Sequence, residues 1–180
     1  MIAYIRIPKT ASCTVLDAIE GVQSVEHEPI EFYKDAVATF TFVRNPWERL
    51  YSWYRHAAYF HQRTFREYVL GEQTHPMHPV APTQFYRHGN ANQTDMLVAD
   101  QRDWFRTRRP TCIGRFEHLE RDLRCIGDTL GFKVGAVQHL NQTEHERPYL
   151  GADHWDAEML ERMAPLFDPF AAEFNYEAPR

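Results

Sequence analysis

The chain has 180 residues, of which 43% are hydrophobic and 14% aromatic, so it can build one compact domain but is too short for two ordinary ones. Its formal charge of −5 gives no general attraction to nucleic acid or to an anionic membrane, and we expect neither as a partner. No apolar run has the length of a membrane span, and the first residues lack the pattern of a signal peptide, which predicts a cytoplasmic protein.

The first part of the chain alternates between predicted strands and helices. A strand over 2–7 is followed by a loop over 8–12 and by a helix to about residue 20 that Gly21 ends. An extended segment over 22–27 leads to a helical turn near 30–34. The stretch ATFTFV at 38–43 is rich in β-formers and predicts a buried strand.

A second helix begins with clear capping signals. Asn45 is a good N-cap, Pro46 suits the first helical position, and Glu48 lies where a capping box places its acid. Glu48, Ser52 and Arg55 are expected on one face. The residues expected on the buried face recur at helical spacing: Trp47, Leu50, Tyr51, Tyr54 and Ala58.

The second half has a proline-rich predicted loop over 71–92 and further elements beyond it. These are helices over 94–99, 103–108 and 116–130, a strand over 111–114, and a last helix over 157–167 interrupted near Pro165 or Pro169. Strands alternating with helices predict parallel crossover units. We therefore expect a single α/β domain over 1–180, with a central parallel sheet flanked by helices.

Polar side chains gather where the first predicted strand passes into a helix. Lys9, Thr10, Ser12 and Thr14 add one cation and three hydroxyls around a helix N-terminus, which itself favours phosphate or sulfate. Ligands of such sheets bind at the carboxyl ends of the strands. The alternative interpretation is that Ser12 only caps the helix while Lys9 points into solvent. The stretch lacks the glycines of a Walker A loop, which disfavours an ordinary NTPase.

A second strand-to-helix junction has a similar arrangement of polar residues. Arg44 ends the strand over 38–43, and Ser52 lies about 12 Å further along the following helix. A guanidinium that grips two oxygens, supplemented by a hydroxyl, would form a second anion site. The alternative for Arg44 is a surface salt bridge with Glu48.

The two junctions resemble known motifs. IPKTASCT at 7–14 resembles the 5′-phosphosulfate-binding motif of sulfotransferases that use 3′-phosphoadenosine 5′-phosphosulfate (PAPS), and RNPWERLYS at 44–52 resembles their 3′-phosphate-binding motif. Later stretches are similar to family blocks in the same order, the first of them to a carbohydrate 6-O-sulfotransferase segment: NANQTDMLVA at 90–99, IGRFEHLERDL at 113–123, HLNQTEH at 139–145 and FAAEFNYEAP at 170–179. The chain is thus similar to the carbohydrate and heparan-type branch.

The resemblance implies a three-layer P-loop-like α/β fold and sulfuryl transfer from PAPS to a hydroxyl, with a carbohydrate as the expected acceptor and no metal. It implies that Lys9 binds the 5′-phosphate and the bridging oxygen, and that Arg44 and Ser52 hold the 3′-phosphate. The rest of the donor loop would be Thr10, Ala11, Ser12, Cys13 and Thr14. Where the family usually has glycine and then threonine, this chain has Ser12 and Cys13, which predicts weaker or differently shaped donor binding.

The acceptor hydroxyl needs a general base, and histidine suits this task at neutral pH. His27 is the first candidate, because relatives place a histidine after the second extended segment. His75 and His78 in the proline-rich loop are rivals, and Glu117 is a weaker candidate. A helix-capping or surface role is the alternative for His27. Neither the ten histidines nor the three cysteines follow a metal-binding spacing.

Two other functions compete with this one. A non-catalytic module that binds the nucleotide or a phosphorylated partner would keep Arg44 and Ser52 and need no base. A nucleoside-phosphate kinase would need a magnesium site that the sequence does not offer. A local basic patch of arginines could serve a sulfated polymer: Arg102, Arg106, Arg108 and Arg109.

Overall fold

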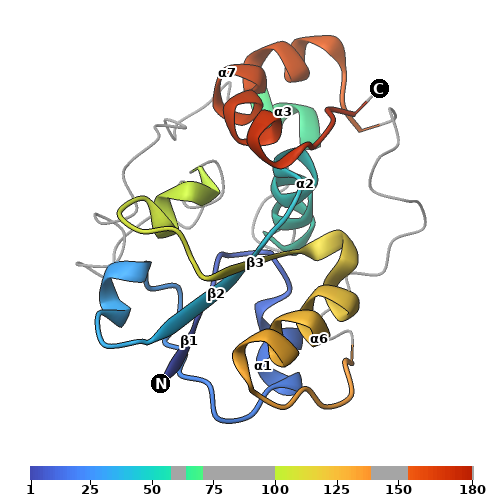
Figure 1. Ribbon diagram of the computed structural model, residues 1–180. Helices are drawn as coiled ribbons and strands as arrows, with labels where there is room; N and C mark the ends of the chain where they lie inside the picture. The colour runs from blue at the N-terminus through green and yellow to red at the C-terminus, as the bar shows by residue number, and fades with distance from the viewer. Residues whose placement is uncertain (58–63, 71–99, 139–153, 180) are drawn as a thin grey trace.

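The computed structural model describes residues 1–57, 64–70, 100–138 and 154–179, with a three-stranded parallel sheet at its centre (Figure 1). The strands are β1 (Ile2–Ile5), β2 (Ala38–Val43) and β3 (Cys112–Arg115), in the order β1-β2-β3. Ile5 pairs with Thr41, and Val43 pairs with Arg115. The predicted α/β class with a parallel sheet is therefore confirmed.

Helices and short 3₁₀ turns connect and cover these strands. In chain order they are α1 (Ser12–Ala18), η1 (Ile30–Tyr33), α2 (Pro46–Ala57), α3 (Phe65–Leu70), η3 (Gln101–Phe105), η4 (Phe116–His118), α6 (Leu119–Leu130) and α7 (Ala157–Phe174). None of the helices in the described ranges is both long and apolar enough to cross a membrane.

The sheet is buried on both faces because its side chains alternate between two cores. Tyr4, Phe40 and Phe42 pack on one face against α1 and α6. Ala3, Ile5 and Val43 face the other way, toward η1, η3 and the end of α7. The two helical layers around the sheet give the expected three-layer arrangement (Figure 1).

A third core joins α2, α3 and α7, which Figure 1 shows grouped beyond the end of the sheet. The predicted buried face of α2 is confirmed for Trp47, Leu50 and Tyr51, which pack against Met159, Met163 and Phe167 of α7. Glu48 and Ser52, expected on a different face, are buried as well. Both faces of this helix are therefore covered near its N-terminus.

The predicted interruption of the last helix is wrong. Helix α7 continues through Pro165 and Pro169 to Phe174. Both prolines lie on the exposed side, where carbonyls left without a helical partner can bond to water. The opposite side buries an apolar row that anchors the helix: Met159, Met163, Phe167, Phe170 and Ala171.

Other boundaries differ by a few residues. Strand β1 ends at Ile5 and α1 at Ala18, so the loop between them is longer and the helix shorter than predicted. The helix predicted over 103–108 is a 3₁₀ turn that begins at Gln101, because the Asp100 side chain accepts a hydrogen bond from the Arg102 N–H and starts the turn earlier. The predicted loop over 71–92, with His75 and His78, the helix over 94–99 and the block at 139–145 lie outside the described residues.

Candidate functional site

The loop between β1 and α1 makes a tight turn with two residues in the left-handed region. Lys9 and Ala11 both have φ of 65°, while Ser12 is the first residue of α1. The conformation that favours glycine thus falls at Lys9 and Ala11, and the backbone does not require glycine at Ser12. Thr10 fixes the turn from inside, since its Oγ1 donates a hydrogen bond of 2.8 Å to the carbonyl of Ile7.

The side chains of this loop divide between the interior and the solvent. Thr10, Ser12 and Thr14 are buried, whereas Cys13 is exposed. Lys9 is half-buried. Burial, together with the nearby charge of Arg44, lowers the pKa of Lys9 from its ordinary value to about 8.

The second junction lies beside the first. Arg44 is only 3% exposed, and its Nη1 donates a hydrogen bond of 3.3 Å to the backbone carbonyl of Lys9. The guanidinium lies 3.9 Å from the centre of the Phe116 ring. Two cations from separate motifs therefore meet at the carboxyl edge of the sheet.

The contact of Arg44 with Glu48 exists, but it is not a surface salt bridge. Arg44 Nη2 lies 3.8 Å from Glu48 Oε2, and both side chains are nearly inaccessible. Burial raises the pKa of Glu48, and the charge of Arg44 opposes that rise. Ser52 follows Glu48 by four residues on α2 and is likewise buried.

His27 lies at the carboxyl end of β1, beside the first loop. Its Nδ1 is 2.9 Å from the backbone carbonyl of Arg6. A carbonyl oxygen only accepts hydrogen bonds, so Nδ1 carries the proton and Nε2 keeps a lone pair. The His27 carbonyl in turn accepts a bond of 2.9 Å from the indole N–H of Trp104, which fixes the backbone.

Burial lowers the pKa of His27 below its ordinary value, and the hydrogen bond to Arg6 opposes this effect only in part. The imidazole is therefore neutral at pH 7, which is the form that can accept a proton. His27 thus lies at the same sheet edge as Lys9, with Nε2 as its hydrogen-bond acceptor.

Glu117 makes contacts that the sequence did not reveal. Its Oε1 accepts a hydrogen bond of 2.9 Å from the Asn45 N–H, and its Oε2 accepts one of 2.9 Å from the Tyr176 hydroxyl. The predicted capping box with Glu48 is therefore wrong, because Glu117 takes the Asn45 N–H that a capping-box acid would accept. Asn45 itself is the predicted cap, since its Oδ1 accepts from the N–H groups of Trp47 and Glu48 at 3.1 and 3.4 Å.

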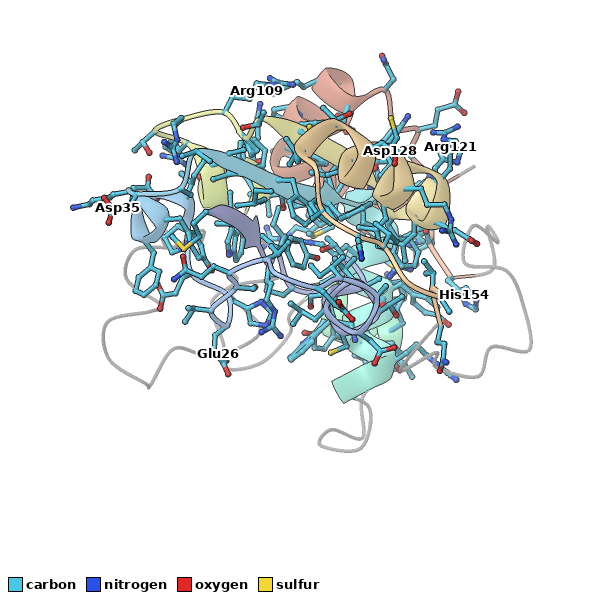
Figure 2. All side chains as sticks on the ribbon, turned by 60° about the horizontal axis from the view of Figure 1, so that its bottom comes forward. Glu26, Asp35, Arg109, Arg121, Asp128 and His154 are labelled. Carbon is cyan, nitrogen blue, oxygen red and sulfur yellow. The ribbon has the colours of Figure 1, made fainter. Side chains whose placement is uncertain are left out.

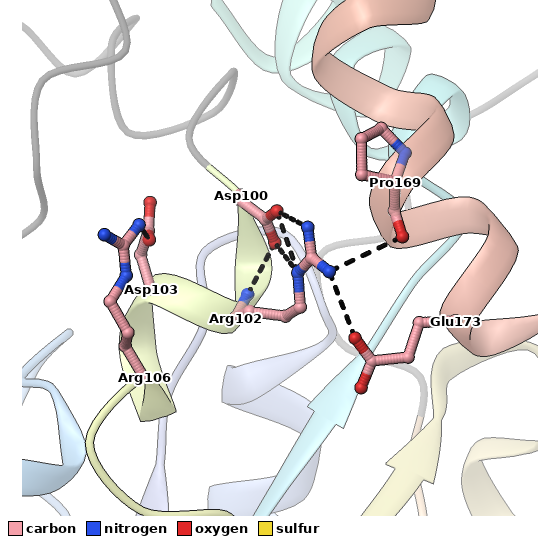
Figure 3. Close-up of polar contacts among 6 residues, drawn as sticks. All are labelled: Asp100, Arg102, Asp103, Arg106, Pro169 and Glu173. Atoms are coloured by element: carbon pink, nitrogen blue, oxygen red, sulfur yellow. Dashed lines mark hydrogen bonds and ion pairs between the residues drawn. The ribbon is translucent and has the colours of Figure 1, made fainter.

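Most of the arginines around η3 are paired with acidic side chains, and they do not form an uncompensated basic patch. Figure 3 shows Arg102 bonded to Asp100 and to Glu173, and Arg106 paired with Asp103. Arg109 also pairs with Glu173, at 3.0 Å. Figure 2 shows the side chain of Arg109 near the outside of the molecule. Acidic neighbours thus offset most of the positive charge that could attract a sulfated polymer.

Metal ligation has no support in the described ranges, where no group of three His, Cys, Asp or Glu side chains could hold an ion. The three cysteines, Cys13, Cys112 and Cys125, are free thiols.

Comparison with known proteins identifies the family of the chain. A model of the family described as "Sulfotransferase family" matches residues 1–164. Searches of curated proteins and of solved structures found no significant match. The matched segment contains Lys9, His27, Arg44 and Ser52 and most of the sheet and helices described above. The chain therefore belongs to the sulfotransferase family, enzymes that move a sulfuryl group from a donor to a hydroxyl-bearing acceptor.

Proposed function

We propose that the protein transfers the sulfuryl group of PAPS to a hydroxyl of a carbohydrate. The proposal rests chiefly on one observation, the hydrogen bond from the Arg44 guanidinium to the Lys9 carbonyl. This bond joins the Arg44 side chain to the backbone of Lys9, and the charge of Arg44 also acts on the Lys9 amine. Two cationic residues at one edge of the sheet suit a donor that carries separate anionic groups.

Different residues would bind different parts of the donor. Lys9 would hold the 5′-phosphate and the bridging oxygen, with Thr10, Ala11, Ser12, Cys13 and Thr14 forming the loop around them. Arg44 would hold the 3′-phosphate, and Ser52 on α2 would supplement it. Arg44 stacks on Phe116 and is shielded from water, which strengthens its attraction for an anion.

The transfer forms a bond from the acceptor oxygen to sulfur and breaks the bond from sulfur to the bridging phosphate oxygen. His27 Nε2 takes the proton of the acceptor hydroxyl, since Nδ1 is already bonded to the Arg6 carbonyl. Lys9 stabilises the negative charge that develops on the leaving phosphate oxygen. Positioning and charge stabilisation account for most of the catalysis, as in phosphoryl transfer.

A carbohydrate acceptor is supported by the similarity of residues 90–99 to a segment of carbohydrate sulfotransferases. The paired arginines around η3 argue that recognition does not depend on a long basic track. A neutral or weakly charged sugar is therefore the acceptor class to test first.

The assignment of Arg44 is tested with 3′,5′-adenosine bisphosphate, the desulfated product, and AMP as a matched ligand without the 3′-phosphate. Arg44→Ala should weaken the binding of the bisphosphate by roughly 1.5–3 kcal/mol, because it removes one charge-assisted contact. The affinity for AMP should scarcely change. Calorimetric titration measures both affinities.

Transfer of label from PAPS to a panel of sugars, measured alongside, tests the reaction itself. If Arg44→Ala lowered the affinity for both nucleotides equally, the residue would support the whole site rather than bind one phosphate. No labelled product with any sugar would refute the carbohydrate acceptor.

A further inference from the structure

The segment that follows α7 returns to the second junction. Asn175 ends the helix with φ of 51° and ψ of 48°, a left-handed conformation that asparagine tolerates. The N–H of Tyr176 then donates a bond of 2.9 Å to the carbonyl of Ala171. The family match ends at residue 164, so this turn and the residues after it lie beyond the matched segment.

The ring of Tyr176 is held from two sides. The guanidinium of Arg115 lies 4.3 Å from the ring centre, and the Phe170 ring is stacked on it at 6.1 Å. Arg115 Nη2 also donates to the carbonyl of Phe174 at 2.8 Å. These contacts fix the direction of the Tyr176 hydroxyl.

That hydroxyl begins a chain of bonds that ends at Asn45. Tyr176 donates to Glu117 Oε2, and Glu117 Oε1 accepts from the Asn45 N–H, both at 2.9 Å. Asn45 Nδ2 donates to the backbone carbonyl of Glu177, also at 2.9 Å. Asn45 is therefore tied to the C-terminal segment through its backbone and its side chain.

Asn45 directly follows Arg44 and caps α2, so whatever fixes Asn45 also fixes the backbone from which the Arg44 side chain extends. The other side of the Arg44–Asn45 peptide is held as well, because the Arg44 carbonyl accepts a bond of 2.6 Å from Gln101 Nε2. Gln101 Oε1 in turn accepts from the Arg44 N–H at 3.0 Å. A cavity of about 440 Å³ borders this network and is lined by Asn45, Glu48, Arg115, Glu117 and Tyr176 among others.

We propose that Glu117 and Tyr176 are positioning residues for the 3′-phosphate of the donor. They hold the junction between Arg44 and Asn45 in place before the donor binds, so the guanidinium does not have to be ordered at that moment. This proposal rests on the proposed function, because it takes Arg44 to be the residue that binds the 3′-phosphate. A carboxylate suits the position because it accepts an N–H and an O–H at once.

The experiment measures Kd for 3′,5′-adenosine bisphosphate and for AMP in the full chain and in five variants. Tyr176→Phe removes only the hydroxyl, and Glu117→Ala removes both acceptors. Either should raise the Kd for the bisphosphate about threefold to tenfold, the effect of one or two hydrogen bonds, and leave the Kd for AMP unchanged. Glu117→Gln keeps an acceptor for Asn45 and should retain most of the preference.

Two further variants separate positioning from general stability. Tyr33→Phe removes a tyrosine hydroxyl that bonds to Val25, away from Arg44, and should lower Tm without changing the ratio of the two Kd values. The double variant Glu117→Ala, Tyr176→Phe should resemble Glu117→Ala alone, because both act through one chain of bonds.

The outcomes distinguish the two proposals. If the wild-type protein does not prefer the bisphosphate, the assignment of Arg44 fails, and the positioning role fails with it. If the wild type prefers the bisphosphate but Tyr176→Phe and Glu117→Ala keep that preference, the positioning role alone is overturned. Additive losses in the double variant would also overturn it.

Discussion

Lys9 can change its charge within the pH range in which enzymes are assayed, because its pKa lies at about 8. Only the protonated amine attracts a phosphate, so the affinity for 3′,5′-adenosine bisphosphate should fall as the pH rises from about 7 to about 9. Lys9→Arg stays protonated throughout and should give a flatter profile. Titrations at several pH values measure both curves, and parallel curves would refute the role of Lys9.

The role of His27 as the base is tested by turnover. His27→Ala should lower kcat by about 10²–10⁴-fold, the usual contribution of a positioned base, and leave nucleotide affinity near wild type. Its lowered pKa places the acidic limb of the wild-type rate profile below the ordinary histidine range, and the variant should lose that limb.

His75→Ala and His78→Ala provide the matched controls for this assay. Residues that only contact the acceptor should mainly raise KM. Full turnover in His27→Ala together with none in His78→Ala would move the base to the segment over 71–92.

The motifs named the residues that we propose for the donor site, but they did not predict the conformations of those residues. The motif predicted that Lys9 and Arg44 act together, and the bond from Arg44 to the Lys9 carbonyl agrees with that expectation. The left-handed φ at Lys9 and Ala11 could not be predicted, because neither residue type favours it. Such conformations arise from the surrounding contacts, here including the bond from Thr10 to Ile7.

At the scale of elements, local signals were reliable where they were strong. The strand over 38–43 and the start of α2 at Pro46 match the predictions, because β-formers and an N-cap act on neighbouring residues. Helix α7 was misjudged because proline is a strong local signal against a helix. Burial of the apolar row from Met159 to Ala171 outweighs it.

The continuity of α7 predicts that its prolines cost stability. Pro165→Ala restores an N–H that can bond to the carbonyl of Glu161, and it should raise the free energy of unfolding by about 1–3 kcal/mol. This gain in stability is smaller than the full cost of a proline, because alanine gives the unfolded chain more conformational entropy than proline does. Denaturant unfolding measures the change.

Ala172→Gly on the exposed side of the same helix calibrates this measurement, since it should lower the free energy of unfolding by about 1 kcal/mol. A loss of stability in Pro165→Ala would show that the rigidity of proline matters more here than the missing hydrogen bond.

At the scale of the molecule, the alternation of strands and helices was enough to predict a parallel sheet between helical layers. The contacts that join distant segments were not predictable. The Asn45 side chain and the Glu177 carbonyl are 132 residues apart, and no periodicity or motif links them. The separate core of α2, α3 and α7 was missed for the same reason.

Ligand binding should be visible in the stability of the whole chain. At equal concentrations, 3′,5′-adenosine bisphosphate should raise Tm more than AMP does, because two anion sites bind it more tightly than one. At ~100 times the dissociation constant the gain is about 2.7 kcal/mol. Thermal unfolding followed by circular dichroism measures this shift, and equal shifts with the two nucleotides would contradict the second anion site.

The closeness of Lys9 and Arg44 also affects the proton balance of binding. In the free protein burial and the nearby charge of Arg44 disfavour the charged form of Lys9, and near pH 8 about half of the Lys9 side chains are neutral. An anionic donor between them favours the charged amine, so binding at that pH takes up about half a proton from the buffer. The heat of binding then includes the ionisation heat of the buffer, and it differs between buffers even when the affinity does not.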